Sequence, residues 1–122
     1  MPARLRPASY DVVRDALAAD PRSPEQTRLL VKHFLAVLAE RAPGASVEVR
    51  VPPYAAVQAI AGVRHTRGTP PAVVELDADT WIALATGSLS WADAGSGGRI
   101  QASGERADLS PLLPLTPREE DA

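Results

Sequence analysis

The sequence predicts one small domain of the α+β class, and three observations support this. A chain of 122 residues suits a single domain with one core. Hydrophobic residues make up 45% and charged residues 23% of the chain, as in ordinary globular domains, so it should fold by itself. Apolar residues recur at helical spacing in some segments and alternate as in strands in others. We expect residues 9–115 to form the domain, between a flexible tail at residues 1–8 and an acidic tail at residues 116–122.

Two helices are predicted in the first third of the chain. In residues 10–19, apolar side chains fall three to four positions apart until an Asp-Pro pair ends the pattern. The next helix should run from Pro24 to about Arg41, because Ser23 suits the cap and proline suits the first helical position. Its apolar stripe consists of Leu30, Val31, Phe34, Leu35, Val37 and Leu38. His33 falls on the polar face of this helix and is expected to be solvated.

Two strands are predicted in the middle of the chain. Val47, Val49 and Val51 alternate with charged residues, as in a strand with one buried face, and a pair of prolines ends this strand. Residues 72–76 form a second strand of β-branched and apolar residues. Between the two, residues 54–60 are rich in alanine, so both a helix and a short strand remain open for this segment.

A helix is predicted directly after the second strand. Asp77 stands where a cap is required, and the helix should cover residues 78–85 until Gly87 ends it in a left-handed conformation. Its apolar face consists of Trp81, Leu84 and Ala85. We interpret Trp81 and the later Trp91 as core residues, because apolar neighbours lie at helical spacing from both.

Short elements are predicted in the last third of the chain. One helical turn is expected at residues 90–94, followed by a flexible turn at residues 95–98. This glycine-rich turn does not have the pattern of a phosphate site, because no lysine follows and a strand comes next. Residues 99–103 alternate as that third strand, and residues 108–113 form one closing helical turn.

Charge and motifs exclude several classes of protein. With 13 basic and 15 acidic side chains, the net charge of −2 does not provide the basic surface that nucleic-acid binding needs. The sequence contains no nucleotide-binding fingerprint or nucleophile elbow, and its two histidines are too few for an all-histidine metal site. We therefore expect no nucleic-acid partner, metal or cofactor. The absence of cysteine, of a secretion signal and of a membrane-spanning stretch favours a cytoplasmic protein without membrane insertion.

One polar cluster stands out, at residues 64–69 together with Glu75, Asp77 and Asp79. A functional interpretation makes His65 a proton carrier or an anion contact, with Arg67 holding a carboxylate or phosphate. The alternative is a network of ion pairs that fixes the loop. We favour the loop-fixing interpretation, because structural ion pairs are commoner than catalytic ones and no partnering nucleophile is evident.

Several runs of residues, taken in their order, carry a likeness to a known family. They are Arg50-Val51-Pro52-Pro53, His65-Thr66-Arg67-Gly68-Thr69-Pro70, Val74-Glu75-Leu76-Asp77-Ala78-Asp79-Thr80-Trp81, Leu84-Ala85-Thr86-Gly87, Gly98-Arg99-Ile100-Gln101-Ala102-Ser103-Gly104, Arg106-Ala107-Asp108-Leu109 and Leu113-Pro114-Leu115. From about Val47 to Leu115, the chain resembles the bacterial branch of the sterol carrier protein family. The resemblance implies a small twisted sheet, of about four to five strands, with helices packed on one face.

The resemblance also implies non-enzymatic binding or carriage of a small apolar ligand, such as a fatty acyl group, a lipid or a sterol, between sheet and helices. Candidates for the apolar lining are Phe34, Leu38, Ile60, Val74, Trp81, Leu84 and Leu112, which could equally form an ordinary core. Candidates for the polar mouth or for fixing the loop are Arg50, His65, Arg67 and Asp77. Two alternatives remain: a ligand-free interaction module, such as a homodimer, and, less favoured, a hydrolase or isomerase that uses His65 with Glu75 or Asp77.

Overall fold

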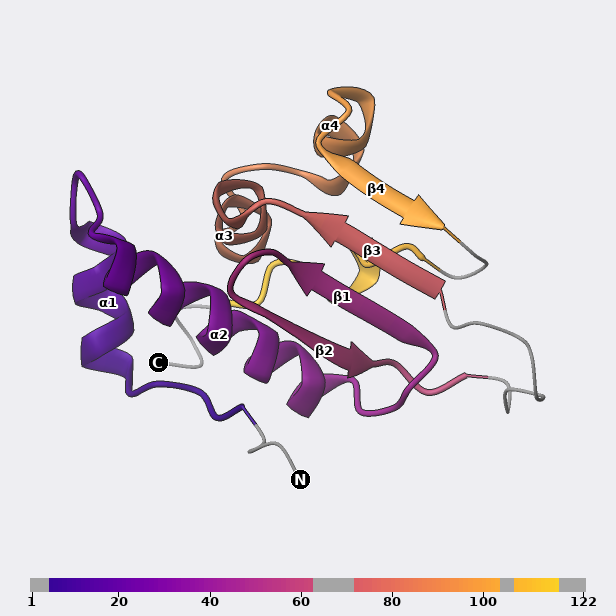
Figure 1. The fold of residues 1–122 in the computed structure, drawn as a ribbon, viewed down its shortest axis with the longest axis horizontal. Coiled ribbons are helices and arrows are strands. Elements are labelled where there is room, and N and C mark those ends of the chain that lie inside the picture. The colour runs from indigo at the N-terminus through magenta and orange to yellow at the C-terminus, as the bar shows by residue number, and fades with distance from the viewer. Residues whose placement is uncertain (1–4, 63–71, 104–106, 117–122) are drawn as a thin grey trace.

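The computed structural model describes residues 5–62, 72–103 and 107–116, which form the layered fold in Figure 1. One four-stranded sheet has the strand order β2-β1-β3-β4. Its strands are β1 (Val47–Val51), β2 (Ala55–Ala59), β3 (Ala72–Leu76) and β4 (Ile100–Ser103). β1 pairs in parallel with β3, whereas β2 and β4 run antiparallel to their neighbours. The predicted α+β class is therefore confirmed.

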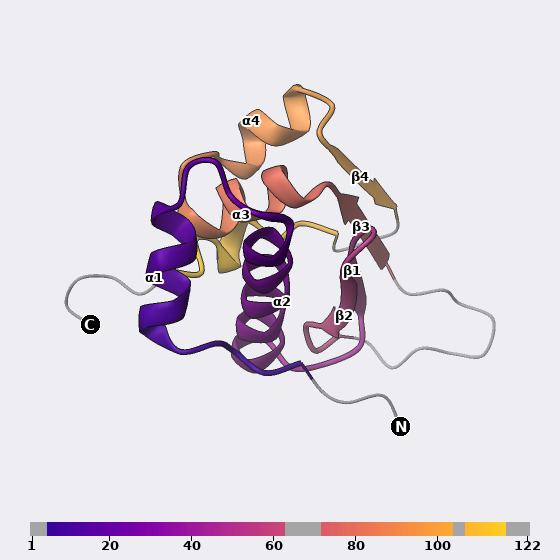
Figure 2. The same cartoon turned by 60° about the vertical axis from the view of Figure 1, so that its left-hand side comes forward.

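The described α-helices lie on one face of the sheet, as the turned view in Figure 2 shows. The helical elements are α1 (Tyr10–Ala18), α2 (Pro24–Arg41), α3 (Ala78–Thr86), α4 (Trp91–Ser96) and the 3₁₀ turn η1 (Ser110–Leu112). α2 is the central helix, because it contacts β2, α1 and α3. α1 packs on the side of α2 that faces away from the sheet. The layers are therefore the sheet, then α2 with α3, then α1.

The alternation of side chains along the central strands explains why the helices cover only one face. Val47, Val49 and Val51 are fully buried, whereas Arg50 is exposed. Val49 is in register with the fully buried Val74 of β3, so the two side chains share the helix face. A sheet with charged side chains on its second face can leave that face in contact with solvent.

α2 begins at the predicted residue because its first turn is fully capped. The Ser23 hydroxyl accepts a hydrogen bond from the Gln26 amide over 3.1 Å, and the Gln26 side chain accepts one from the Ser23 amide over 2.8 Å. This reciprocal capping box satisfies two helix amides that would otherwise lack partners. None of the described helices combines the length and the hydrophobicity that crossing a bilayer requires.

Two segments differ in detail from the sequence-based expectations. The segment left open at residues 54–60 forms strand β2, which pairs with β1 in a hairpin. The flexible turn predicted for residues 95–98 is wrong at its start, because Gly95 and Ser96 belong to α4. The helix continues to Ser96, and the Gly97 amide closes it by donating a hydrogen bond to the Asp93 carbonyl over 3.0 Å.

The expectation that His33 is solvated is also wrong. His33 is half-buried, its Nδ1 accepts a hydrogen bond from the Ala8 amide over 2.9 Å, and its ring stands edge-on to Phe34. Burial lowers the pKa of His33, an effect opposed by the nearby Glu40 carboxylate. Leu5 and Ala8, from the predicted N-terminal tail, pack against the core. The sequence pattern missed this contact because it joins segments that are distant along the chain.

Trp81 should be the most costly side chain to truncate. It is fully buried on α3, and its indole Nε1 donates a hydrogen bond to the Val31 carbonyl of α2 over 3.3 Å. We expect Trp81→Ala to lower the free energy of unfolding by about 3–5 kcal/mol, measured by denaturant titration. Trp91→Ala is the matched control and should cost clearly less, because Trp91 is half-buried at the start of α4. Equal losses in the two variants would contradict this account of the core.

The stability of the protein should fall on acidification because of His33. The pKa of His33 is lowered in the folded state, so the unfolded chain binds the extra proton more readily. The free energy of unfolding should therefore decrease as the pH falls below about 6.5, the ordinary pKa of histidine. Denaturant titrations at several pH values measure this slope. His33→Gln keeps a hydrogen-bond acceptor but does not titrate, and should flatten the slope; parallel profiles for parent and variant would refute the assignment.

Candidate functional site

An apolar groove lies at the end of α2, where the chain leaves the helix layer for the sheet. Its volume is about 480 Å³, within the usual range for small-molecule sites. The residues that line it are Ala42, Pro43, Ile60, Ala61, Asp108, Pro111 and Leu112. Asp108 is the one charged residue of this set, and one of its carboxylate oxygens accepts a hydrogen bond from the Ser110 amide over 2.9 Å. The arrangement can shelter an apolar group from water, with a single polar group at its rim.

Two of the predicted lining residues, Ile60 and Leu112, line this apolar groove. The other five candidates lie in the core, where each is at most 1% exposed: Phe34, Leu38, Val74, Trp81 and Leu84. Ile60 and Leu112 are half-buried and pack against the same core cluster. All seven residues therefore belong to one continuous apolar assembly, whose surface reaches solvent at the groove.

The backbone at Ile60 has an unusual conformation. Its φ angle is +71°, the one positive value among the described residues other than glycine. Three hydrogen bonds hold it: the Ile60 amide donates to the Ala42 carbonyl over 2.6 Å, and the Ile60 carbonyl accepts from the Ser46 amide over 3.0 Å and the Ser46 hydroxyl over 2.6 Å. Gly44 packs so closely that any Cβ there would collide with the Ile60 carbonyl. These contacts fix one wall of the apolar groove.

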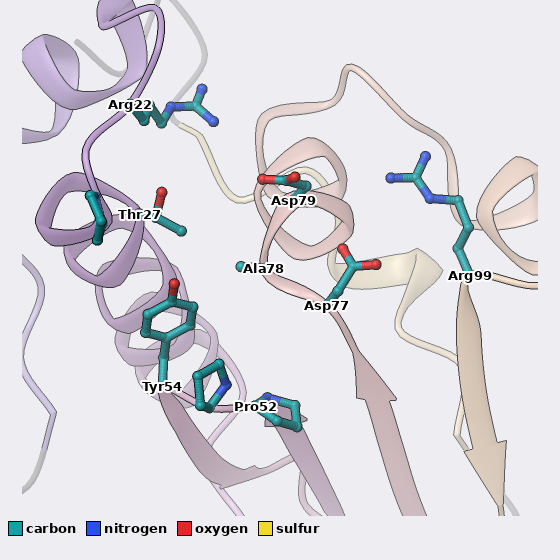
Figure 3. Close-up of a pocket in the computed structure, with 10 residues that line it drawn as sticks. Arg22, Thr27, Pro52, Tyr54, Asp77, Ala78, Asp79 and Arg99 are labelled. Atoms are coloured by element: carbon teal, nitrogen blue, oxygen red, sulfur yellow. The ribbon is translucent and has the colours of Figure 1, made fainter.

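A second groove, which is polar, lies at the other end of α2 and is shown in Figure 3. It has a volume of about 510 Å³ and sits beyond the carboxyl ends of the parallel strands β1 and β3. Its lining consists of Arg22, Pro24, Thr27, Pro52, Pro53, Tyr54, Asp77, Ala78, Asp79 and Arg99. Thr27 and Tyr54 form one side, and the start of α3 with Arg99 forms the other.

The charged groups of the polar groove hold structural elements in place. Arg22 donates from Nε to the Ala16 carbonyl over 3.2 Å, at the end of α1. Arg99 donates from Nε to the hydroxyl of the buried Thr80 over 3.0 Å, and the Asp77 carboxylate accepts from the Thr80 amide over 2.7 Å. Among the described residues, no group of three His, Asp or Glu side chains is placed to hold a metal ion. These contacts give Arg22, Asp77 and Arg99 structural roles.

The structure does not bring the described candidates for a polar mouth together. Arg50 lies on the open face of the sheet, where it pairs with Glu48 and stands in register with Glu75. Asp77 caps α3 at the edge of the polar groove. His65 and Arg67 lie outside the described residues. Neither Arg50 nor Asp77 lines the apolar groove.

Sequence reasoning missed most of the residues that form the two grooves. Tyr54, Arg22 and Arg99 come from segments far apart in the chain, and no local spacing links them. A sequence signal that could have indicated the grooves is proline. Pro43 follows the end of α2 and Pro52 follows the end of β1, and both grooves are formed where such elements end.

Comparison with known proteins identifies one family. The model of the family described as "Bacterial SCP ortholog" matches residues 23–115, from the cap of α2 to beyond η1. No curated protein matches the sequence.

Asp77 should act as a helix cap in solution. Asp77→Ala removes the acceptor of the Thr80 amide and should lower the free energy of unfolding by about 1 kcal/mol. Asp77→Ser keeps an acceptor at the same position and should restore most of this loss. Thermal or denaturant unfolding measures both. Asp79→Ala, in the first turn of the same helix, should cost less, and an equal cost at the two positions would argue against capping by Asp77.

Proposed function

The chain belongs to the family of bacterial SCP orthologs, and on this premise we propose that it binds and carries a small apolar ligand. The ligand class is a fatty acyl group, a lipid or a sterol-like molecule. The proposed site begins at the apolar groove and extends along the boundary between helices and sheet. The observation that carries this proposal is the groove itself, where Ile60 and Leu112 open the apolar core to solvent.

The physical basis of binding is the transfer of apolar surface out of water. Each buried methylene contributes about 0.8 kcal/mol, so roughly ten of them supply the ~8 kcal/mol of a micromolar complex before the costs of association. This arithmetic favours long chains over short ones. Ala42 lines the groove at the end of α2, and Leu38 lies one helical turn before it. An acyl chain that extends beyond the groove would therefore meet Leu38 of α2. Entry deeper into the domain requires core side chains to move, because Leu38 and Phe34 are already buried.

We propose a carrier without catalysis, located in the cytoplasm. The positions of the two acidic candidates support the absence of a reaction: the Asp77 carboxylate accepts a hydrogen bond from the Thr80 amide, and Glu75 lies on β3 in register with Arg50. Neither residue lines the apolar groove. The proposed role of the residues is to exclude water and hold the ligand, for which no nucleophile or general base is needed.

A second candidate function is a ligand-free module that forms homodimers. It is favoured by the open face of the sheet, which no described helix covers. Val73 is half-buried on this face, and a shallow depression of about 270 Å³ adjoins it. Native mass spectrometry of protein purified without detergent separates the two functions, because a carrier should retain lipid mass whereas a dimerisation module should show two chains without it.

The proposed carrier should bind cis-parinaric acid, a fluorescent long-chain fatty acid, with micromolar affinity, or about −8 kcal/mol. Leu112→Asp places a second carboxylate in the apolar groove and should weaken binding at least tenfold, because a charge opposes apolar burial. Tyr54→Phe changes only the polar groove and should bind as the parent does. Fluorescence titration measures all three affinities. The carrier proposal fails if the parent shows no saturation well above micromolar concentrations, and equal binding by Leu112→Asp would place the ligand elsewhere.

A further inference from the structure

We propose that Ile60 is a direct contact of the bound ligand, and that its strained backbone holds the side chain in the apolar groove. This inference rests on the proposed carrier function and assigns a residue to its site. Three observations support it: the backbone conformation of Ile60, the contacts that enforce this conformation, and the place of Ile60 in the lining of the groove.

The backbone conformation carries a cost that isoleucine need not bear. At a φ of +71°, a β-branched residue is strained, whereas glycine adopts this conformation freely and asparagine tolerates it. Such strained conformations are concentrated at functional sites. If the position served only to turn the chain after β2, glycine would do so at lower cost. The isoleucine side chain therefore does more than turn the chain: it packs against the core cluster and also lines the apolar groove.

Hydrogen bonds on both sides of the Ile60 residue hold its backbone in this conformation. The Ile60 amide is bound to the Ala42 carbonyl at the end of α2, and its carbonyl is bound twice by Ser46, just before β1. Gly44 lies against the same carbonyl and has no Cβ to push it away. The junction of α2, β1 and β2 thus fixes the direction in which the Ile60 side chain points. A fixed side chain lowers the entropy cost of ligand binding.

Ile60 stands at the place where the proposed ligand lies. Ile60 lines the apolar groove at the end of β2, and Leu112 lines it from η1. Both residues are half-buried, so each has apolar surface that a ligand could still cover. The two residues come from different elements, and of the two only Ile60 has a backbone held in a positive φ conformation.

Two substitutions separate the effect of the Ile60 side chain on binding from the effect of its backbone strain on stability. Ile60→Ala removes most of the side chain but keeps the strained backbone, whereas Ile60→Gly removes both. Ile60→Gly should therefore melt several degrees higher than Ile60→Ala. Binding of cis-parinaric acid should nevertheless weaken in both, each by about tenfold, which corresponds to about 1.4 kcal/mol. Ile60→Val, which keeps the branched side chain, should bind nearly as the parent does.

Each outcome decides between a ligand contact and a purely structural residue. The proposal is supported if Ile60→Gly binds the probe weakly although it melts at a higher temperature than Ile60→Ala. The loss of affinity would then not follow from a loss of stability. Affinity that recovers with stability in Ile60→Gly overturns it and makes Ile60 a packing residue. Unchanged affinity in both variants, with a parent that binds the probe, overturns it while the carrier function stands. A parent that does not bind the probe overturns both.

Discussion

The burial of α2 between the sheet and α1 is the constraint on which the rest of the structure depends. Its apolar stripe is almost completely buried, and its contacts reach β2, α1 and α3. Both ends of the helix are fixed by specific hydrogen bonds, the capping box of Ser23 at one end and the bond between Ala42 and Ile60 at the other. The helix therefore sets the distance and direction between the sheet and the outer layer, and the other elements adjust to it.

Both grooves follow from this placement of α2. A helix that crosses the sheet leaves space at each of its ends, where loops rather than side-chain layers close the surface. At the first end, the loops bring charged residues that bond to neighbouring elements, and the polar groove results. At the second end, Pro43, Ile60 and Leu112 meet with Asp108 as the one charged residue of the lining, and the groove is apolar. The difference in chemistry between the two ends reflects which residues the loops supply.

Local patterns predicted the elements well because the physical causes are local. The cap at Ser23, the alternation of Val47 to Val51 and the cap at Asp77 each act within a few residues, and the structure contains all three. The grooves were not predictable in the same way. Ile60 joins the end of α2 to the start of β1, and Arg99 bonds to Thr80 across an intervening helix, so their roles exist only once the chain has folded. The prediction that His33 is solvated failed for the same reason, because its partner Ala8 is distant along the chain.

The pairing of β1 with β3 has a consequence for the route by which the chain folds. β1 and β2 form a hairpin of neighbouring segments, whereas the parallel register joins Val47 to Ala72 across a long connection. Closing such a loop costs chain entropy before the new contacts repay it. We expect the hairpin to form early and the centre of the sheet to be completed late. The most buried part of the sheet is then the last to be assembled. During synthesis, the valines of β1 remain partly exposed to water until the ribosome has made β3 and α3.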